Sequence, residues 1–295
     1  MPVTNLISSS LDPSKEKTLV LLSCSRDKRP GGKPYDSSTR SIARALSRTG
    51  QELSGKRRLI ASMLRHDTSQ QRLYDKDQKG GFRDERECNR NLKLGADFGG
   101  KETGGLYLPA HERYSGRFFS RLHSENPGFW QNLLNPGIDV LFVSGLYGLA
   151  YWNELIQDYD CHFNDYTSDA EPRAVAKIWL GSLTASLFEL IGVYKSSSER
   201  IKVFDLLSEE AYQRVFDWNK VHGSGACVYH RVFKTIAGPD MLPALAVILA
   251  QEFPRFLARR EFKRGEWYPL HTEESTVEYG FELPIGSAGL WPLTR

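Results

Sequence analysis

Four apolar runs along the chain end in small or polar residues. They are TLVLLSCS (residues 18–25), GIDVLFVSG (137–145), RIKVFDLLSEEAY (200–212) and ACVYHRVFKTI (226–236). Continuous runs of leucine, valine and isoleucine are typical of strands that are buried on both faces, as in a parallel sheet. The first three runs therefore predict central parallel strands. The fourth alternates in part and predicts a strand whose direction the pattern leaves open.

Helical spacing occupies stretches between and after these runs. Residues 37–49 and 172–191 place apolar side chains on one face, and prolines predict two shorter helices at 242–252 and 254–262. Alternating strands and helices predict an α/β fold with a mixed, mostly parallel central sheet and helices on both faces. The length of 295 residues fits a single domain that spans residues 1–295.

Composition narrows the class of protein. Hydrophobic residues make up 40% and charged residues 25%, which are globular values. No apolar run approaches the roughly 18 residues of a spanning helix, and the N-terminus does not resemble a signal peptide, so we expect a cytoplasmic protein without a membrane partner. The four cysteines form no CxxC pair and no phosphate-binding glycine motif occurs, so we expect neither a metal nor a cofactor. The oligomeric state is left open.

Positive charge is concentrated in one segment, residues 55–105. From Lys56 to Glu102 it contains twelve basic and eight acidic residues, an excess of four, whereas the whole chain carries a net charge of +3. Its many glycines predict a partly mobile insertion within the domain. The segment is either a solvated surface insertion or a flap that contacts phosphates, because clustered lysine and arginine neutralise phosphates and release counterions. On the second interpretation the DNA-binding residues are Arg57, Arg58, Arg83 and Arg86.

A second basic stretch lies near the C-terminus. Arg259, Arg260 and Lys263 recur at helical spacing among phenylalanines. Such a helix could lie along a DNA backbone, or it could be an amphipathic surface helix whose phenylalanines face the core.

The polar ends of the predicted strands suggest a site. Ligands of open α/β sheets bind beyond the carboxyl ends of the strands, and parallel strands bring these ends to one edge. The loops SCSRDK, SGLYG and LLSEEAY would then share that edge. In SGLYG, Ser144, Gly145 and Tyr147 either face a ligand or form a tight turn with the tyrosine in the core.

Four motifs occur in an order that resembles the YaaA-like family. They are LLSCSRDK (21–28), LPAHERYSGRFF (108–119), VSGLYGLAYWNELIQDYD (143–160) and VFDLLSEEAYQRVF (203–216). The chain departs from the family where Gln157 and Asp158 precede Tyr159 in place of a proline, and where Ala211 separates Glu210 from Tyr212. The resemblance implies DNA binding and protection against DNA damage, with base excision in anti-phage settings for some members.

Base excision sets chemical requirements that these motifs can meet. A DNA glycosylase extrudes its base from the duplex and stabilises an oxocarbenium-like sugar as the base leaves. Asp160 is the preferred catalytic carboxylate and Glu210 the second choice, although Asp160 could instead cap a turn and Glu210 could interact with a helix dipole. The expected partner is double-stranded DNA with a flipped base, and modified cytosine in phage DNA is one possible target.

The remaining predicted site residues would surround that base. Aromatic rings would stack on it, hydroxyl groups would read its polar edge, and a lysine would meet a phosphate or the leaving base. These substrate-binding residues are Ser23, Ser25, Lys28, Tyr114, Gly116, Ser144, Gly145, Tyr147, Gly148 and Tyr159.

Other functions use the same residues. A non-catalytic DNA-binding protein would protect nucleic acid under oxidative stress, and an enzyme of free nucleobases or nucleotides would need the pocket without the basic flap. His111 and Glu112 suggest an acid–base pair, but adjacent residues of a strand or helix point apart, so His111 is expected to pack or to face solvent.

Overall fold

The protein is described by a computed structural model that covers residues 16–67, 71–76, 81–133, 137–234, 236, 240–252, 267–271 and 276–282. Its strands are β1 (Glu16–Ser23), β2 (Leu73–Asp75), β3 (Gly81–Phe82), β4 (Leu108–Pro109), β5 (Ile138–Ser144), β6 (Gly148–Tyr151), β7 (Leu155–Ile156), β8 (Tyr166–Thr167), β9 (Arg200–Leu206), β10 (Cys227–Phe233), β11 (Tyr268–His271) and β12 (Thr276–Glu282). Its helices are α1 (Ile42–Ala45), α2 (Gly50–Leu64), α3 (Glu87–Arg90), α4 (Ala110–Arg113), α5 (Arg117–Glu125), α6 (Phe129–Asn132), α7 (Val175–Trp179), α8 (Ser182–Lys195), α9 (Glu210–Gln213), α10 (Trp218–Gly223) and α11 (Met241–Val247). Short turns of other helix types are η2 (Arg83–Glu85), η3 (Ala96–Phe98) and η5 (Ile248–Glu252).

A seven-stranded mixed sheet forms the centre of the fold, in the order β11-β12-β10-β9-β1-β5-β6. Strands β10, β9, β1 and β5 are parallel, and Leu21 of β1 lies opposite Asp205 of β9 and Leu141 of β5. Strand β6 is antiparallel to β5, and β12 to β10. The predicted mostly parallel sheet is confirmed. The fourth predicted strand, β10, is parallel to β9. The strand-end loops after β9, β1 and β5 therefore do meet at one edge.

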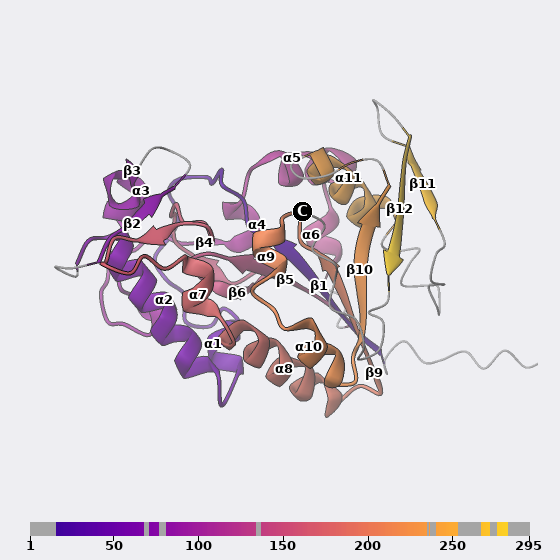
Figure 1. The fold of residues 1–295 in the computed structure, drawn as a ribbon, viewed down its shortest axis with the longest axis horizontal. Coiled ribbons are helices and arrows are strands. Elements are labelled where there is room, and N and C mark those ends of the chain that lie inside the picture. Colours follow the sequence, from indigo (N-terminus) through magenta and orange to yellow (C-terminus); the bar gives the residue numbers. More distant parts are fainter. Residues whose placement is uncertain are drawn as a thin grey trace, which may run out of the picture.

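Helices lie on both sides of this sheet (Figure 1). Helices α8 and α10 pack on one face, while α5 and α11 pack together on the other. Six consecutive residues of β1 are buried because both faces are covered, which explains why its centre, Leu19–Leu22, is continuously apolar.

Helix boundaries differ from those the sequence predicts. The helix expected over 172–191 is two helices, α7 and α8, because Gly181 between them has a φ of 79°, which favours glycine and interrupts the helix. Of the helix expected over 37–49, only α1 forms. The helix expected over 242–252 is observed as α11 and η5, and the one over 254–262 lies outside the described residues.

The basic segment predicted over 55–105 begins inside helix α2. This helix buries Ile60 and Met63 in the main hydrophobic core, so the start of the segment packs with the rest of the domain. The rest of the segment includes β2 and β3, which pair with β8 in a small separate sheet. None of the helices in the described ranges is long and apolar enough to cross a membrane.

Candidate functional site

A pocket of about 330 Å³ lies where the loops after β1 and β9 meet the segment that follows Tyr159. We call it the strand-end pocket. Its lining includes Cys24, Ser25, Arg26 and Lys28 from the first loop, Asp160, Cys161, His162, Asn164 and Asp165 from the third segment, and Asp75, Arg83, Glu209 and Tyr212. Three of the four sequence motifs therefore contribute side chains to one hollow, and the preferred carboxylate, Asp160, is among them.

Carboxylates form the floor of the strand-end pocket around one buried arginine. Arg83 contacts Asp160 at 2.7 Å and both Asp75 and Asp165 at 2.9 Å. Burial alone would lower the pKa of Arg83, but the charges of Asp165, Asp160 and Asp75 outweigh it, and the pKa is raised. Arg86 also lies 3.5 Å from Asp160, so three carboxylates against two guanidinium groups leave one negative charge in excess. The floor is therefore suited to stabilising a cation, and Arg83, predicted to bind DNA, instead orients Asp160.

His162 and Glu209 form a second polar group in the strand-end pocket. The backbone N–H of Asn164 donates to Nδ1 of His162 at 3.1 Å, which leaves Nε2 to face Glu209 Oε2 at 3.2 Å. A histidine hydrogen-bonded to a carboxylate can carry a proton in catalysis. Glu210, the second choice of catalytic carboxylate from the sequence, does not line the pocket: it is exposed on α9 and pairs with Arg214.

The tyrosines predicted to stack on a base lie in the core. Tyr114, Tyr147 and Tyr159 are at most 1% exposed, so they cannot form a wall of the pocket. The hydroxyl of Tyr159 instead hydrogen-bonds those of Ser144 at 2.6 Å and Tyr114 at 2.8 Å. Above the ring of Tyr159, at 4.1 Å from its centroid, lies the ammonium of Lys28. The three hydrogen-bonded hydroxyl groups thus fix the ring of Tyr159, and this ring in turn contacts Lys28, which lines the strand-end pocket.

The SGLYG motif forms the buried connection between β5 and β6. Ser144 lies opposite Gly148 in the strand pair, and its hydroxyl accepts the N–H of Tyr147 at 3.0 Å. Gly148 has a φ of 66°, and a Cβ there would meet Trp179 at 2.8 Å. Gly145 accepts a hydrogen bond from the Trp179 indole. The alternative interpretation is correct: the motif is a tight turn with its tyrosine in the core.

The other small residues tie the loops to one another. Ser25 accepts the N–H of Gly116 at 3.0 Å and lines the strand-end pocket. Ser23 accepts the N–H of Ser208 at 3.0 Å and so joins the ends of β1 and β9, outside the pocket lining. A Cβ at position 116 would lie 2.3 Å from the Ser25 hydroxyl, which explains the glycine. Gly116 and Ser23 therefore shape the site without facing it.

The residues predicted to bind DNA differ in exposure. Arg57 is fully buried, where it pairs with Glu154 at 2.8 Å and donates to the Tyr147 carbonyl, so it cannot reach a phosphate. Arg58 and Arg86 are exposed, and Arg86 lies 3.5 Å from Asp160 at the mouth of the pocket. Arg259, Arg260 and Lys263 fall outside the described residues.

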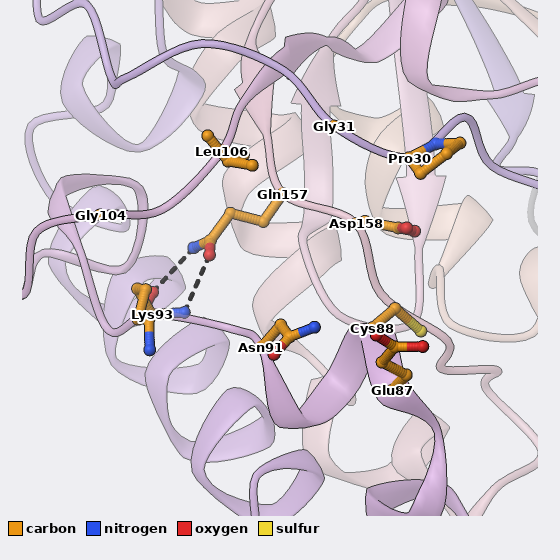
Figure 2. Close-up of a pocket in the computed structure, with 10 residues that line it drawn as sticks. All are labelled: Pro30, Gly31, Glu87, Cys88, Asn91, Lys93, Gly104, Leu106, Gln157 and Asp158. Carbon is orange, nitrogen blue, oxygen red and sulfur yellow. Dashed lines mark hydrogen bonds between the residues drawn. The ribbon is translucent and has the colours of Figure 1, made fainter.

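A larger hollow of about 530 Å³ is lined by Gln157 and Asp158, which precede Tyr159, and we call it the lateral cavity (Figure 2). Its lining comprises Pro30, Gly31, Glu87, Cys88, Asn91, Lys93, Gly104, Leu106, Gln157 and Asp158. Sequence reasoning assigned no role to these residues. The sequence analysis mentions two of them, Gln157 and Asp158, and only as a departure from the YaaA-like family, because they stand where the family has a proline.

Neither metal ligands nor relatives assign a role to the site. Within the described ranges no group of three or more histidine, cysteine, aspartate or glutamate side chains could hold a metal ion. No family model matches the chain, and no curated protein matches it. We therefore argue its function from the strand-end pocket and from the sequence motifs.

Proposed function

We propose that the strand-end pocket cleaves the N-glycosidic bond of a nucleotide in DNA and so releases a base. The observation that carries this proposal is the negatively charged floor around Asp160, with Lys28 and Arg26 on the same lining. Breaking this bond puts positive charge on the sugar, and a preorganised carboxylate lowers the energy of that state. The two cations supply the matching contacts for phosphates.

The reaction can be written on the residues present. The bond between C1′ and the base nitrogen breaks, its electron pair leaves with the base, and Asp160 stabilises the cationic sugar. Water then adds its hydroxyl to C1′. The proton it loses passes through the His162–Glu209 pair to the departing base, which balances the reaction.

Double-stranded DNA is the proposed substrate because basic residues surround the mouth of the pocket. Arg26 and Arg29 are exposed on the loop after β1, and Arg86 lies beside Asp160. The resemblance to the YaaA-like family supports the same partner and a role in DNA damage or anti-phage defence. Among described residues the four cysteines are free thiols, which is consistent with the cytoplasm.

An abasic-site cleavage assay on modified and unmodified duplexes tests this function. We expect the protein to release a base, and Asp160→Asn to abolish release while DNA binding is unchanged. Glu210→Gln is the matched control, because this exposed carboxylate pairs with Arg214 and should leave activity intact. Intact DNA on every modified substrate, bulky modified cytosines included, would reject the activity, and full activity of Asp160→Asn would reject the role of Asp160.

A free nucleotide is the second candidate substrate. It is favoured by the burial of Arg57 and Arg83, which removes two cations from the proposed DNA surface. Deleting the basic segment cannot separate the two substrates, because Arg83 holds the floor together. Replacing Arg29 with alanine can, because Arg29 is exposed and lies outside the pocket lining. The change should weaken DNA binding, lower the slope of its salt dependence by roughly one, and leave free-nucleotide cleavage unchanged.

A non-catalytic DNA-binding protein remains the alternative to any enzyme. It would bind with the same salt dependence, release no base from any substrate and be insensitive to Asp160→Asn.

A further inference from the structure

Two buried groups fix the walls of the lateral cavity. Arg113 is fully buried, and its guanidinium donates to the carbonyls of Arg29, Gly31, Leu106 and Ile156. These carbonyls belong to both the loop after β1 and the strand pair β4–β7, so one side chain holds opposite walls at a set distance. A cavity built in this way keeps its shape before a ligand arrives.

Gln157 fixes a third wall. Its amide pairs with the backbone of Lys93, accepting at 2.8 Å and donating at 2.7 Å, as the dashed lines of Figure 2 show. The same amide nitrogen donates to buried Asp97 at 3.1 Å. Because the Gln157 amide is fully engaged within the protein, it positions the backbone and leaves recognition to its neighbour, Asp158.

Asp158 is the polar group of this cavity that is best placed for recognition. It is half-buried and forms no ion pair with any residue in the described ranges. Burial raises the pKa of Asp158, and the charges of Arg113 and Lys28 oppose that rise. The side chain lies between Pro30 and Cys88 in Figure 2. A carboxylate held this way offers two acceptor oxygens to a ligand.

The lateral cavity and the strand-end pocket lie next to each other. Tyr159 points into the core, and the half-buried carboxylates on either side of it, Asp158 and Asp160, line one hollow each. Residues two apart in an extended segment are separated by about 7 Å. Cys88 lines the lateral cavity, and after burial the charges of both Asp158 and Asp160 raise the pKa of its thiol, which places it near both carboxylates. One nucleoside can therefore place its sugar over Asp160 and its base beside Asp158.

We propose that the lateral cavity is the base-binding subsite of this enzyme and that Asp158 selects a base with the hydrogen-bonding edge of guanine. The proposal rests on the function proposed above. Guanine presents two adjacent donors, N1–H and the 2-amino group, which match the two oxygens of a carboxylate. Adenine presents one donor beside an acceptor, and thymine a donor between two acceptors, so both leave a carboxylate oxygen facing an acceptor.

Binding of free nucleosides tests this subsite without requiring catalysis. Affinities for guanosine, inosine and adenosine are measured in the Asp160→Asn protein, where no turnover is expected. Guanosine should bind roughly tenfold to a hundredfold more tightly than adenosine, and inosine, which lacks the 2-amino group, should fall between them. Equal affinities for guanosine and adenosine would overturn the proposal, and this comparison needs no change at Asp158.

Changing Asp158 sharpens the same experiment. Asp158→Asn, added to Asp160→Asn, replaces two acceptors with one donor and one acceptor, so the preference should shift from guanosine toward adenosine. Glu112→Gln is the matched control, because Glu112 is an exposed carboxylate outside the lining of either hollow, and the preference should persist. A guanosine preference that survives Asp158→Asn would assign recognition to another group.

The outcomes separate this inference from the proposed function. Guanosine preference in a protein that releases no base from DNA would reject the glycosylase and retain the subsite. Base release from DNA by a protein that binds guanosine and adenosine equally would retain the glycosylase and reject the subsite.

Discussion

Arg83 shows how one side chain can be assigned the wrong role by its neighbours in sequence. It lies in a run rich in charge, which predicted a phosphate contact, yet it is 5% exposed and is held by three carboxylates. A buried cation with several buried partners is costly to remove, because its partners are left uncompensated. Its contribution is to the shape and charge of the pocket floor.

Replacing Arg83 with methionine should therefore destabilise the fold by about 3 to 5 kcal/mol at pH 8. The loss should shrink at pH 5. Burial raises the pKa of Asp165 and Arg83 opposes that rise, so without the guanidinium the folded pKa of Asp165 rises further, and the free energy of unfolding then falls as the pH rises. Urea unfolding at both pH values measures the effect.

Arg86→Met is the control for that experiment. Arg86 is exposed and lies 3.5 Å from the same Asp160, so its loss should cost about 1 kcal/mol or less at either pH. Equal losses for the two variants would contradict a structural role for Arg83.

At the scale of elements, the β5–β6 connection depends on a glycine that the sequence presented as part of a ligand loop. Gly148 has a φ of 66°, and an added Cβ would meet Leu183 and Trp179, both at 2.8 Å. The glycine is therefore required by the turn and by the close approach of α7 and α8.

Gly148→Ala should destabilise the protein by about 1 to 3 kcal/mol, from backbone strain and from overpacking. Gly192→Ala, within α8, is the matched control. A Cβ at position 192 meets nothing within 4 Å, so alanine should stabilise the helix by roughly 0.5 to 1 kcal/mol. Thermal unfolding of both variants measures the difference, and a destabilised Gly192→Ala would show that the two sites are not distinguished by space and φ.

At the scale of the whole molecule, Asp97 connects segments that are distant in sequence. Its carboxylate accepts hydrogen bonds from Tyr107 at 3.0 Å, Tyr147 at 2.7 Å and Gln157 at 3.1 Å. Burial raises its pKa from 3.8 to about 6, although these hydrogen bonds and Arg57 oppose the rise. The network joins the SGLYG turn to the walls of the lateral cavity.

This network predicts a pH dependence of stability. The folded protein holds the Asp97 proton more tightly than the unfolded chain does, so the contribution of this group to the free energy of unfolding falls as the pH rises from 3.8 to about 6. The fall should be at most about 3 kcal/mol. Asp97→Asn should flatten the profile over that range in chemical unfolding. An unchanged profile would show that Asp97 titrates alike in both states.

Much of the fold followed from local patterns. The runs at 18–25, 137–145 and 200–212 are rich in leucine, valine, isoleucine and phenylalanine because both faces of a central parallel strand are buried, and such runs can be recognised without knowledge of their partner strands. The helix pattern was less informative at its ends, since Gly181 breaks 172–191 at a position that apolar spacing does not mark.

The sequence by itself determined that polar loops follow parallel strands, and hence that Ser25 and Lys28 lie at the edge of the sheet where the site is. Only the tertiary structure decided which of the nearby groups face the hollow. Glu209 lines it and Glu210 does not, while Arg83 is enclosed by Asp160 and Asp165, which lie 77 and 82 residues away in the chain. Burial and charge pairing depend on such distant partners, which the spacing of residues along the chain does not reveal.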